Sequence, residues 1–202
     1  MLQAINPTTG EQLAEQDALS AEAAAGVIER VADGFPDWRA LSMAARAERL
    51  HAMAKALRDN KDELADLMAL EMGKPLAEGL GEVEKSAFCA EYYAKHGADF
   101  LASETIASDA SRSFVQYPPL GTVLGILPWN APTWLALRFL APALMAGNTC
   151  VMKPDPHVPA TARALERIFH ESGLPENVMA NLPITNDLVA DLIDHPRIKA
   201  VS

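Results

Sequence analysis

Residues 121–154 read GTVLGILPWNAPTWLALRFLAPALMAGNTCVMKP and contain one complete strand–helix–strand unit. The apolar runs at 122–127 and 149–153 predict two strands, and the longer apolar segment at 133–145 predicts the helix between them. Each run begins with a threonine and continues with consecutive apolar residues, through 127 in the first and through Met152 in the second, instead of alternating with polar residues. This is typical of strands that helices cover on both faces, so the unit predicts parallel pairing.

The same alternation continues to the last residue. Helices are predicted at 158–171 and 186–193, and strands at 178–182 and 198–202. We therefore assign the chain to the α/β class and treat 119–202 as one βαβ region. Because the last predicted strand reaches residue 202 and would leave an open apolar edge, we expect a truncated fold, the front portion of a longer one.

Residues 1–118 predict a mainly helical region with arm or hairpin segments. Ser20 is a candidate cap for a helix to about Asp33, which 35–38 would end, and Ser42 begins a further helix. Asn60 and 73–75 separate the helices that follow, and a long helix is predicted at 76–100. A turn at 6–11 and a strand at 114–117 predict the hairpin segments.

Composition excludes several classes of protein. The chain has 202 residues with 17 Lys and Arg against 27 Asp and Glu, a net charge of −10, which disfavours nucleic-acid binding. Two cysteines form no disulfide framework, so we expect a cytoplasmic protein. The most apolar stretch, 135–147, is too short to span a bilayer, and we expect no membrane partner. The five histidines lack metal-ligand spacing, so no metal site is predicted.

Asn130 lies between Pro128 and Pro132, just after the first strand of the quoted stretch. This is the ligand-binding edge of a parallel sheet. Two prolines stiffen the turn, so the Asn130 amide is suited to donate to an oxyanion. The alternative is that Asn130 only caps the helix that follows.

Lys153 ends the second strand of the stretch and is followed by Pro154. A lysine at this edge can reach a ribose hydroxyl or a phosphate as a point charge. The alternative is a solvated lysine at a strand end. Because the two signals are one βαβ unit apart, both indicate the same crevice.

With these motifs the sequence resembles the aldehyde dehydrogenase superfamily, most closely its succinate-semialdehyde dehydrogenases. The motifs that carry the resemblance are the stretches at 6–11, 71–75, 119–121, 128–132, 146–149, 153–154, 173–175 and 195–196, together with Trp38. The resemblance implies an N-terminal helical region (1–118) and the first half of a Rossmann-like NAD(P)-binding domain (119–202).

The resemblance also implies roles for individual residues. Asn130 would help to form the oxyanion hole, Ile126, Leu127, Pro128 and Trp129 would line the nicotinamide side of the cleft, and Lys153 would contact the adenosine ribose. The reaction would be oxidation of a small aldehyde, such as succinate semialdehyde, to the acid with NAD or NADP as cofactor. The full-length protein would be a homo-oligomer.

The sequence departs from the family's pattern after the Lys-Pro motif, where Asp155 and Pro156 stand. A glutamate there favours NAD; Pro156 removes it and Asp155 adds a carboxylate next door, so the choice between NAD and NADP stays open. The family's nucleophilic cysteine and general-base glutamate would lie beyond residue 202. Cys89 and Cys150 are interpreted as packing residues, so we expect this chain alone to be inactive. The alternative is a non-catalytic fragment or pseudoenzyme that associates with related subunits.

Overall fold

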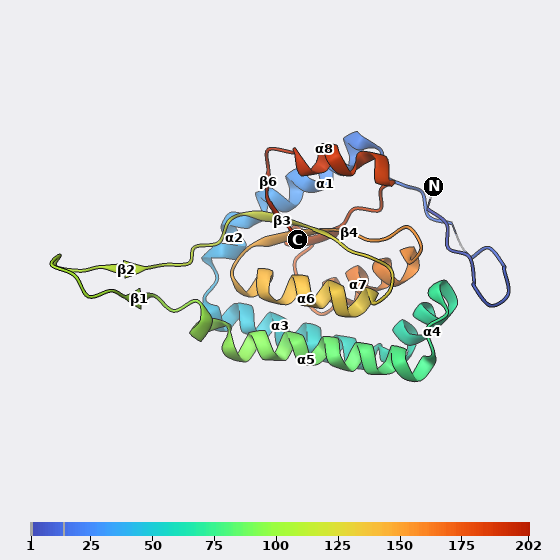
Figure 1. Cartoon of the computed structure of the whole chain (residues 1–202), viewed down its shortest axis with the longest axis horizontal. Helices are drawn as coiled ribbons and strands as arrows, with labels where there is room; N and C mark the ends of the chain where they lie inside the picture. Colours follow the sequence, from blue (N-terminus) through green and yellow to red (C-terminus); the bar gives the residue numbers. More distant parts are fainter. Residues whose placement is uncertain (1, 14) are drawn as a thin grey trace.

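A parallel sheet lies at the centre of the molecule (Figure 1). The computed structural model describes residues 2–13 and 15–202, and in this part of the chain the sheet has four strands in the order β5-β4-β3-β6. They are β3 (Thr122–Ile126), β4 (Thr149–Lys153), β5 (Met179–Asn181) and β6 (Ile198–Val201). Each pairs with its neighbour in parallel, which confirms the α/β class.

Successive side chains of the central strands enter two different cores. Val123, Cys150 and Met152 belong to one apolar cluster, and Leu124 and Val151 belong to the other. This is the period of two that a strand imposes on its side chains. The central strands are therefore buried on both faces, as their continuous apolar runs predict.

The sheet has helices on both faces. Helices α6 (Pro132–Met145) and α7 (Pro159–Glu171) cover one face, where they follow β3 and β4 along the chain. The other face carries α1 (Ala21–Asp33) and α8 (Val189–Ile193), the latter directly after the short 3-10 helix η1 (Asn186–Leu188). Figure 1 shows these two layers on opposite sides of the strands.

A further helical layer packs outside α6 and α7. It consists of α3 (Met43–Asp59), α4 (Lys61–Met72) and α5 (Leu76–Phe100), which contact α6 or α7. Ser20 and Ser42 cap α1 and α3 through their hydroxyls, as the sequence predicts. Gly73 ends α4 with a φ of 72°, a left-handed conformation that glycine adopts at low cost.

Three local features differ from the sequence prediction or refine it. Residues 35–38 were predicted to end α1, but they belong to a separate short helix, α2 (Phe35–Ala40). Pro36 lies in the first turn of this helix, where proline is tolerated. The strand predicted at 114–117 covers only Phe114–Val115 (β2), and it pairs with β1 (Glu104–Thr105), which no sequence pattern indicated. Figure 1 shows this ribbon projecting from the body of the molecule.

The N-terminal turn forms the small hairpin that the sequence predicts. Ile5 and Gln12 form an antiparallel bridge, and the Asn6 side chain accepts hydrogen bonds from Thr8 N and Thr9 N. One apolar cluster contains residues from both 1–118 and 119–202, so the two regions share a core. Their division into two domains stays a prediction. None of the helices in 2–13 and 15–202 is long and apolar enough to cross a membrane.

Candidate active site

The two sequence motifs meet because β3 and β4 are adjacent, parallel and in register. Ile126, the last residue of β3, lies opposite Lys153, the last residue of β4. One residue later, Leu127 N donates a 3.0 Å hydrogen bond to Lys153 O. The loop that carries Asn130 and the end of β4 therefore leave the same edge of the sheet, where parallel α/β sheets bind ligands.

The segment that leaves β3 becomes progressively exposed. Ile126 and Leu127 are half-buried, whereas Pro128, Trp129 and Asn130 are exposed. The Ile126 amide donates to Ser202 O at 3.0 Å, and Leu127 packs against the larger core. The edge thus presents a short loop with an accessible indole and an accessible amide before α6 begins.

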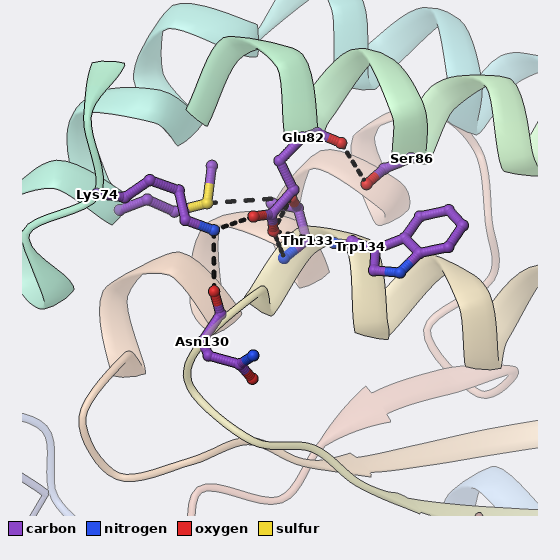
Figure 2. Close-up of polar contacts among 7 residues, drawn as sticks. Lys74, Glu82, Ser86, Asn130, Thr133 and Trp134 are labelled. Atoms are coloured by element: carbon purple, nitrogen blue, oxygen red, sulfur yellow. Dashed lines mark hydrogen bonds and ion pairs between the residues drawn. The ribbon is translucent and has the colours of Figure 1, made fainter. Parts of the chain in front are cut away.

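Asn130 does not cap α6, so that alternative interpretation is wrong. The N-cap residue is Ala131, and no side chain at the N-cap position accepts a hydrogen bond from the helix. The main-chain oxygen of Asn130 accepts a 3.0 Å hydrogen bond from Lys74 Nζ. Figure 2 shows the Asn130 side-chain amide pointing away from Lys74.

The first turn of α6 is capped by Glu82, which comes from α5. Its Oε1 accepts from Thr133 N at 2.9 Å, from Thr133 Oγ1 at 2.7 Å and from Trp134 N at 3.1 Å. Its Oε2 pairs with Lys74 Nζ (Figure 2). The two side chains of this ion pair are only 9% and 8% exposed, so water screens the pair weakly.

Lys153 is buried, with 4% of its surface exposed, so the alternative of a solvated strand-end lysine is wrong. Its Nζ donates a 2.6 Å hydrogen bond to Asn186 Oδ1 at the start of η1. Burial lowers the pKa of the Lys153 ammonium, because the charged form loses its hydration, and the nearby Asp155 carboxylate opposes this shift.

The two residues after the Lys-Pro motif differ in what they offer. Asp155 is half-buried, and its Oδ1 accepts from His157 N at 3.0 Å and contacts His157 Nδ1 at 2.6 Å. The Asp155 carboxylate therefore acts on Lys153 through space and not by a direct ion pair. Pro156 is half-buried and provides no side-chain hydrogen-bonding group.

The sequence did not predict the contacts that three further residues make at this edge. Lys74 and Glu82 come from the helical layer, 56 and 51 residues away along the chain from Asn130 and Thr133. From the sequence, Asn186 is only the first residue of the helix predicted at 186–193. For Lys74, the motif at 71–75 was a usable signal, but it does not indicate which atoms the lysine contacts.

Neither cysteine has the environment of a nucleophile. Cys89 and Cys150 are buried and unpaired. Burial raises the pKa of both thiols, most strongly for Cys150 at the centre of the sheet, so the reactive thiolate is disfavoured. Within 2–13 and 15–202, no group of three or more His, Cys, Asp or Glu side chains could hold a metal ion.

A cavity of about 290 Å³ lies between α5 and α6, one turn along α6 from the Asn130 loop. It is lined by aromatic side chains and by two cations, and the lining residues are Lys85, Phe88, Cys89, Tyr92, Tyr93, Trp134 and Arg138. The Lys85 ammonium lies 3.9 Å from the centroid of the Trp134 ring, a favourable cation–π contact. Arg138 is exposed and forms no ion pair with any residue that the structure describes.

Known proteins are similar to this chain along its whole length. Succinate semialdehyde dehydrogenase [NAD(P)+] Sad of Escherichia coli is 38% identical over 198 residues, which are 98% of this chain and 43% of that protein. An aldehyde dehydrogenase of Paenarthrobacter nicotinovorans is 40% identical over 202 residues, covering 98% and 44%. The chain thus spans less than half the length of these curated relatives.

Solved structures have the same fold. Succinic semialdehyde dehydrogenase from Streptococcus pyogenes, in complex with NADP+, superposes with a TM-score of 0.95 at 32% identity, covering 100% of this chain and 44% of that one. The sequence profile described as the aldehyde dehydrogenase family matches residues 1–202. These matches confirm the resemblance seen in the motifs, and the chain belongs to the aldehyde dehydrogenase family.

Proposed function

We propose that this chain supplies the oxyanion-stabilising amide and the nucleotide-binding lysine of an NAD(P)-dependent enzyme that oxidises a small aldehyde, such as succinate semialdehyde, to the acid. The observation that carries the proposal is the pairing of β3 with β4, which brings the Asn130 loop and Lys153 to one edge of the sheet. Two relatives that are 38% identical to this chain are named as NAD(P)+- and NADP+-linked succinate-semialdehyde dehydrogenases.

The groups at this edge fit a dinucleotide cofactor. The Lys153 ammonium has three donor hydrogens, and among the described residues its hydrogen-bond partner is Asn186. The remaining donors are suited to ribose hydroxyls, with Ile126, Leu127, Pro128 and Trp129 beside the nicotinamide and Asp155 and Pro156 next to Lys153. When bound, the cofactor supplies the hydride acceptor.

Asn130 is suited to the oxyanion role because its side chain is free of the helix cap. Its main-chain oxygen is held by Lys74, and its amide points away from that contact (Figure 2). A donor that is already oriented stabilises developing negative charge without reorganisation during the reaction. Asn130 would then donate its amide N–H to the oxygen of the reacting carbonyl.

The charges that line the cavity between α5 and α6 favour a small aldehyde substrate that carries a carboxylate. Arg138 and Lys85 contribute two positive charges beside an aromatic wall. Arg138 forms no ion pair with any other described residue, so its guanidinium is well suited to bind a carboxylate by two parallel hydrogen bonds. Succinate semialdehyde has a carboxylate at one end and an aldehyde at the other, so this cavity favours it over neutral aldehydes.

The nucleophile would come from outside this chain, because the thiols of Cys89 and Cys150 are buried with raised pKa values. We therefore propose that residues 1–202 bind nucleotide but do not oxidise aldehydes alone. A homo-oligomeric state and a cytoplasmic location of the protein stay predictions.

Two measurements test the proposal. Residues 1–202 are titrated with NADP+ and with NAD+ by calorimetry, and NADPH formation from succinate semialdehyde is followed by absorbance. We expect binding of at least one nucleotide and no turnover. Turnover by this chain alone would contradict the need for an external nucleophile, and absence of binding would contradict the assignment of Lys153.

Activity is measured in a chimaera in which residues 1–202 replace the matching segment of the Escherichia coli relative. Asn130→Ala is expected to lower kcat by about 100-fold, the usual loss for one oxyanion donor. Arg138→Met is expected to raise KM for succinate semialdehyde and to leave KM for propanal unchanged. An unchanged kcat in Asn130→Ala would refute the oxyanion role.

A further inference from the structure

The Asn130 loop is held from outside the sheet by two side chains of the helical layer. Lys74 lies between the end of α4 and the start of α5, and Glu82 lies on α5 (Figure 2). Both contact the junction between β3 and α6, the Lys74 ammonium at Asn130 and the Glu82 carboxylate at Thr133 and Trp134. Neither contact is needed to build the parallel sheet itself.

Glu82 replaces a local helix cap that this sequence lacks. The N-cap residue of α6 is Ala131, whose side chain has no oxygen to accept a hydrogen bond. One carboxylate oxygen of Glu82 instead satisfies the two free N–H groups of Thr133 and Trp134 and the Thr133 hydroxyl. A negative charge at this end also complements the helix dipole. The start of α6 is therefore fixed relative to α5.

Lys74 transmits this fixed position to the loop. Its ammonium pairs with the second Glu82 oxygen and donates to Asn130 O at 3.0 Å. A carbonyl held in one direction fixes the plane of the peptide bond that follows it. The backbone of Asn130 is thus held on the side opposite to its amide, which points away from Lys74 (Figure 2).

We propose that Lys74 and Glu82 are positioning residues that orient the Asn130 amide for catalysis, an inference that rests on the oxyanion role proposed for Asn130. The buried ion pair holds the loop in the orientation that the reaction requires, so no binding energy of the substrate is used to arrange it. Neither residue contacts substrate or cofactor in this role; each acts through Asn130.

The chain contains a matched control for this device. Glu71 caps α7 in the same manner, since its carboxylate accepts from Ala160 N at 2.7 Å, Thr161 N at 2.9 Å and Thr161 Oγ1 at 2.7 Å. Among the described residues, no lysine connects Glu71 to a loop. Glu71→Gln therefore weakens an equivalent cap without touching the Asn130 loop.

The first test uses residues 1–202 and hydrogen–deuterium exchange. Lys74→Met is expected to speed exchange in the segment 129–134 and to leave the segment 160–164 as in the wild type. Glu71→Gln is expected to give the reverse pattern. If Lys74→Met leaves exchange at 129–134 unchanged, the ammonium does not hold the loop and the proposal is overturned.

The second test is a double-mutant cycle in the chimaera described above. Lys74→Met is expected to lower kcat by about 10-fold with KM for NADP+ unchanged, and to have no further effect when Asn130 is already alanine. Glu71→Gln should combine additively with Asn130→Ala. If Lys74 had only a structural role, its effect on kcat would add to that of Asn130→Ala, as expected for Glu71→Gln.

The outcomes separate the two proposals. If Asn130→Ala leaves kcat unchanged, the proposed function of Asn130 fails, and the positioning role fails with it. If Asn130→Ala lowers kcat but the effect of Lys74→Met is additive with it, the oxyanion role stands and the positioning role is refuted.

Discussion

The Lys153 ammonium and the Asn186 side-chain oxygen are 2.6 Å apart, so a hydrogen bond joins the end of β4 to the first residue of η1. The ammonium is buried, and burial lowers the pKa of Lys153. A neutral amide does not neutralise the charge of a buried cation, so further hydrogen-bond acceptors would stabilise the ammonium. A nucleotide that binds at this edge therefore competes with Asn186 for the lysine or joins it.

Replacing Lys153 is expected to weaken nucleotide binding. Lys153→Met keeps an apolar side chain of similar length and removes the charged donor, which contributes about 1.5–3 kcal/mol per hydrogen bond, or roughly a 10- to 100-fold change in Kd. Calorimetric titration of residues 1–202 with NADP+ and NAD+ checks this. Lys199→Met, at an exposed lysine of β6, is the control and should bind as the wild type does. If Lys153→Met and Lys199→Met bind the nucleotide with equal affinity, Lys153 does not contact it.

Asn186 is expected to couple energetically to Lys153. In the wild type, Asn186→Ala leaves a buried ammonium without its partner and should lower the free energy of unfolding by about 1–3 kcal/mol. With Lys153 already changed to Met, the same substitution should cost much less. Urea unfolding of the four proteins of this cycle measures the coupling. Additive losses would mean that the 2.6 Å contact contributes nothing in solution.

Glu71 is expected to make stability depend on pH. Burial raises the pKa of Glu71 above its ordinary value of 4.5, although hydrogen bonds from Thr161 and Ala160 oppose the shift. A raised folded-state pKa means that the folded state binds more protons, so the contribution is fully present below pH 4.5 and is lost as pH rises through the folded pKa. Gln does not titrate, so the unfolding free energy of the wild type minus that of Glu71→Gln should fall as pH rises. A value of this signed difference that increases with pH would contradict the raised pKa.

Both cysteines are expected to resist alkylation in the folded protein. Cys89 and Cys150 are buried, and burial raises the pKa of each thiol. Reaction with iodoacetamide at neutral pH should be at least about 10-fold slower in buffer than in denaturant, because it requires local opening of the structure. Mass spectrometry of the modified peptides distinguishes the two sites. Rapid alkylation of either cysteine in the folded protein would show that its thiol is accessible and could act as a nucleophile.

Gly125 is expected to be required where β3 passes under α6. A Cβ at this position would lie 2.6 Å from the Phe139 ring, a distance that forces a shift. Gly125→Ala should therefore destabilise the fold by about 1–3 kcal/mol, as over-packing does. Phe139→Leu should recover part of this loss in the double variant, as measured by urea unfolding. No recovery would indicate that the strain lies in the backbone and not at the ring.

Much of the architecture could be predicted from local patterns. Ser20 and Ser42 cap the helices that follow them, and Gly73 ends α4 in the left-handed conformation. These signals depend on residues within a turn of one another, so a sequence contains them completely. The β1–β2 ribbon was predicted only in part, because pairing of two short exposed strands leaves little apolar pattern.

Local sequence patterns could not predict the side-chain contacts that hold the site together. Glu82 caps α6 from 51 residues away, and Lys74 contacts Asn130 from 56 residues away. Which carboxylate reaches a given helix end depends on how the outer helices pack on α6 and α7. The same holds for Asn186, whose partner is decided by the placement of η1 beside β4.

The sequence by itself determined the alternation of strands and helices and the edge of the sheet at which Asn130 and Lys153 would meet. Hydrophobic period, caps and the parallel order of strands suffice for this, since they act between near neighbours or follow from chain direction. Only the tertiary structure decided that Lys153 is buried against Asn186 and that Lys74 and Glu82 hold the Asn130 loop. Burial and side-chain partners depend on the packing of distant elements, which no local stretch of residues encodes.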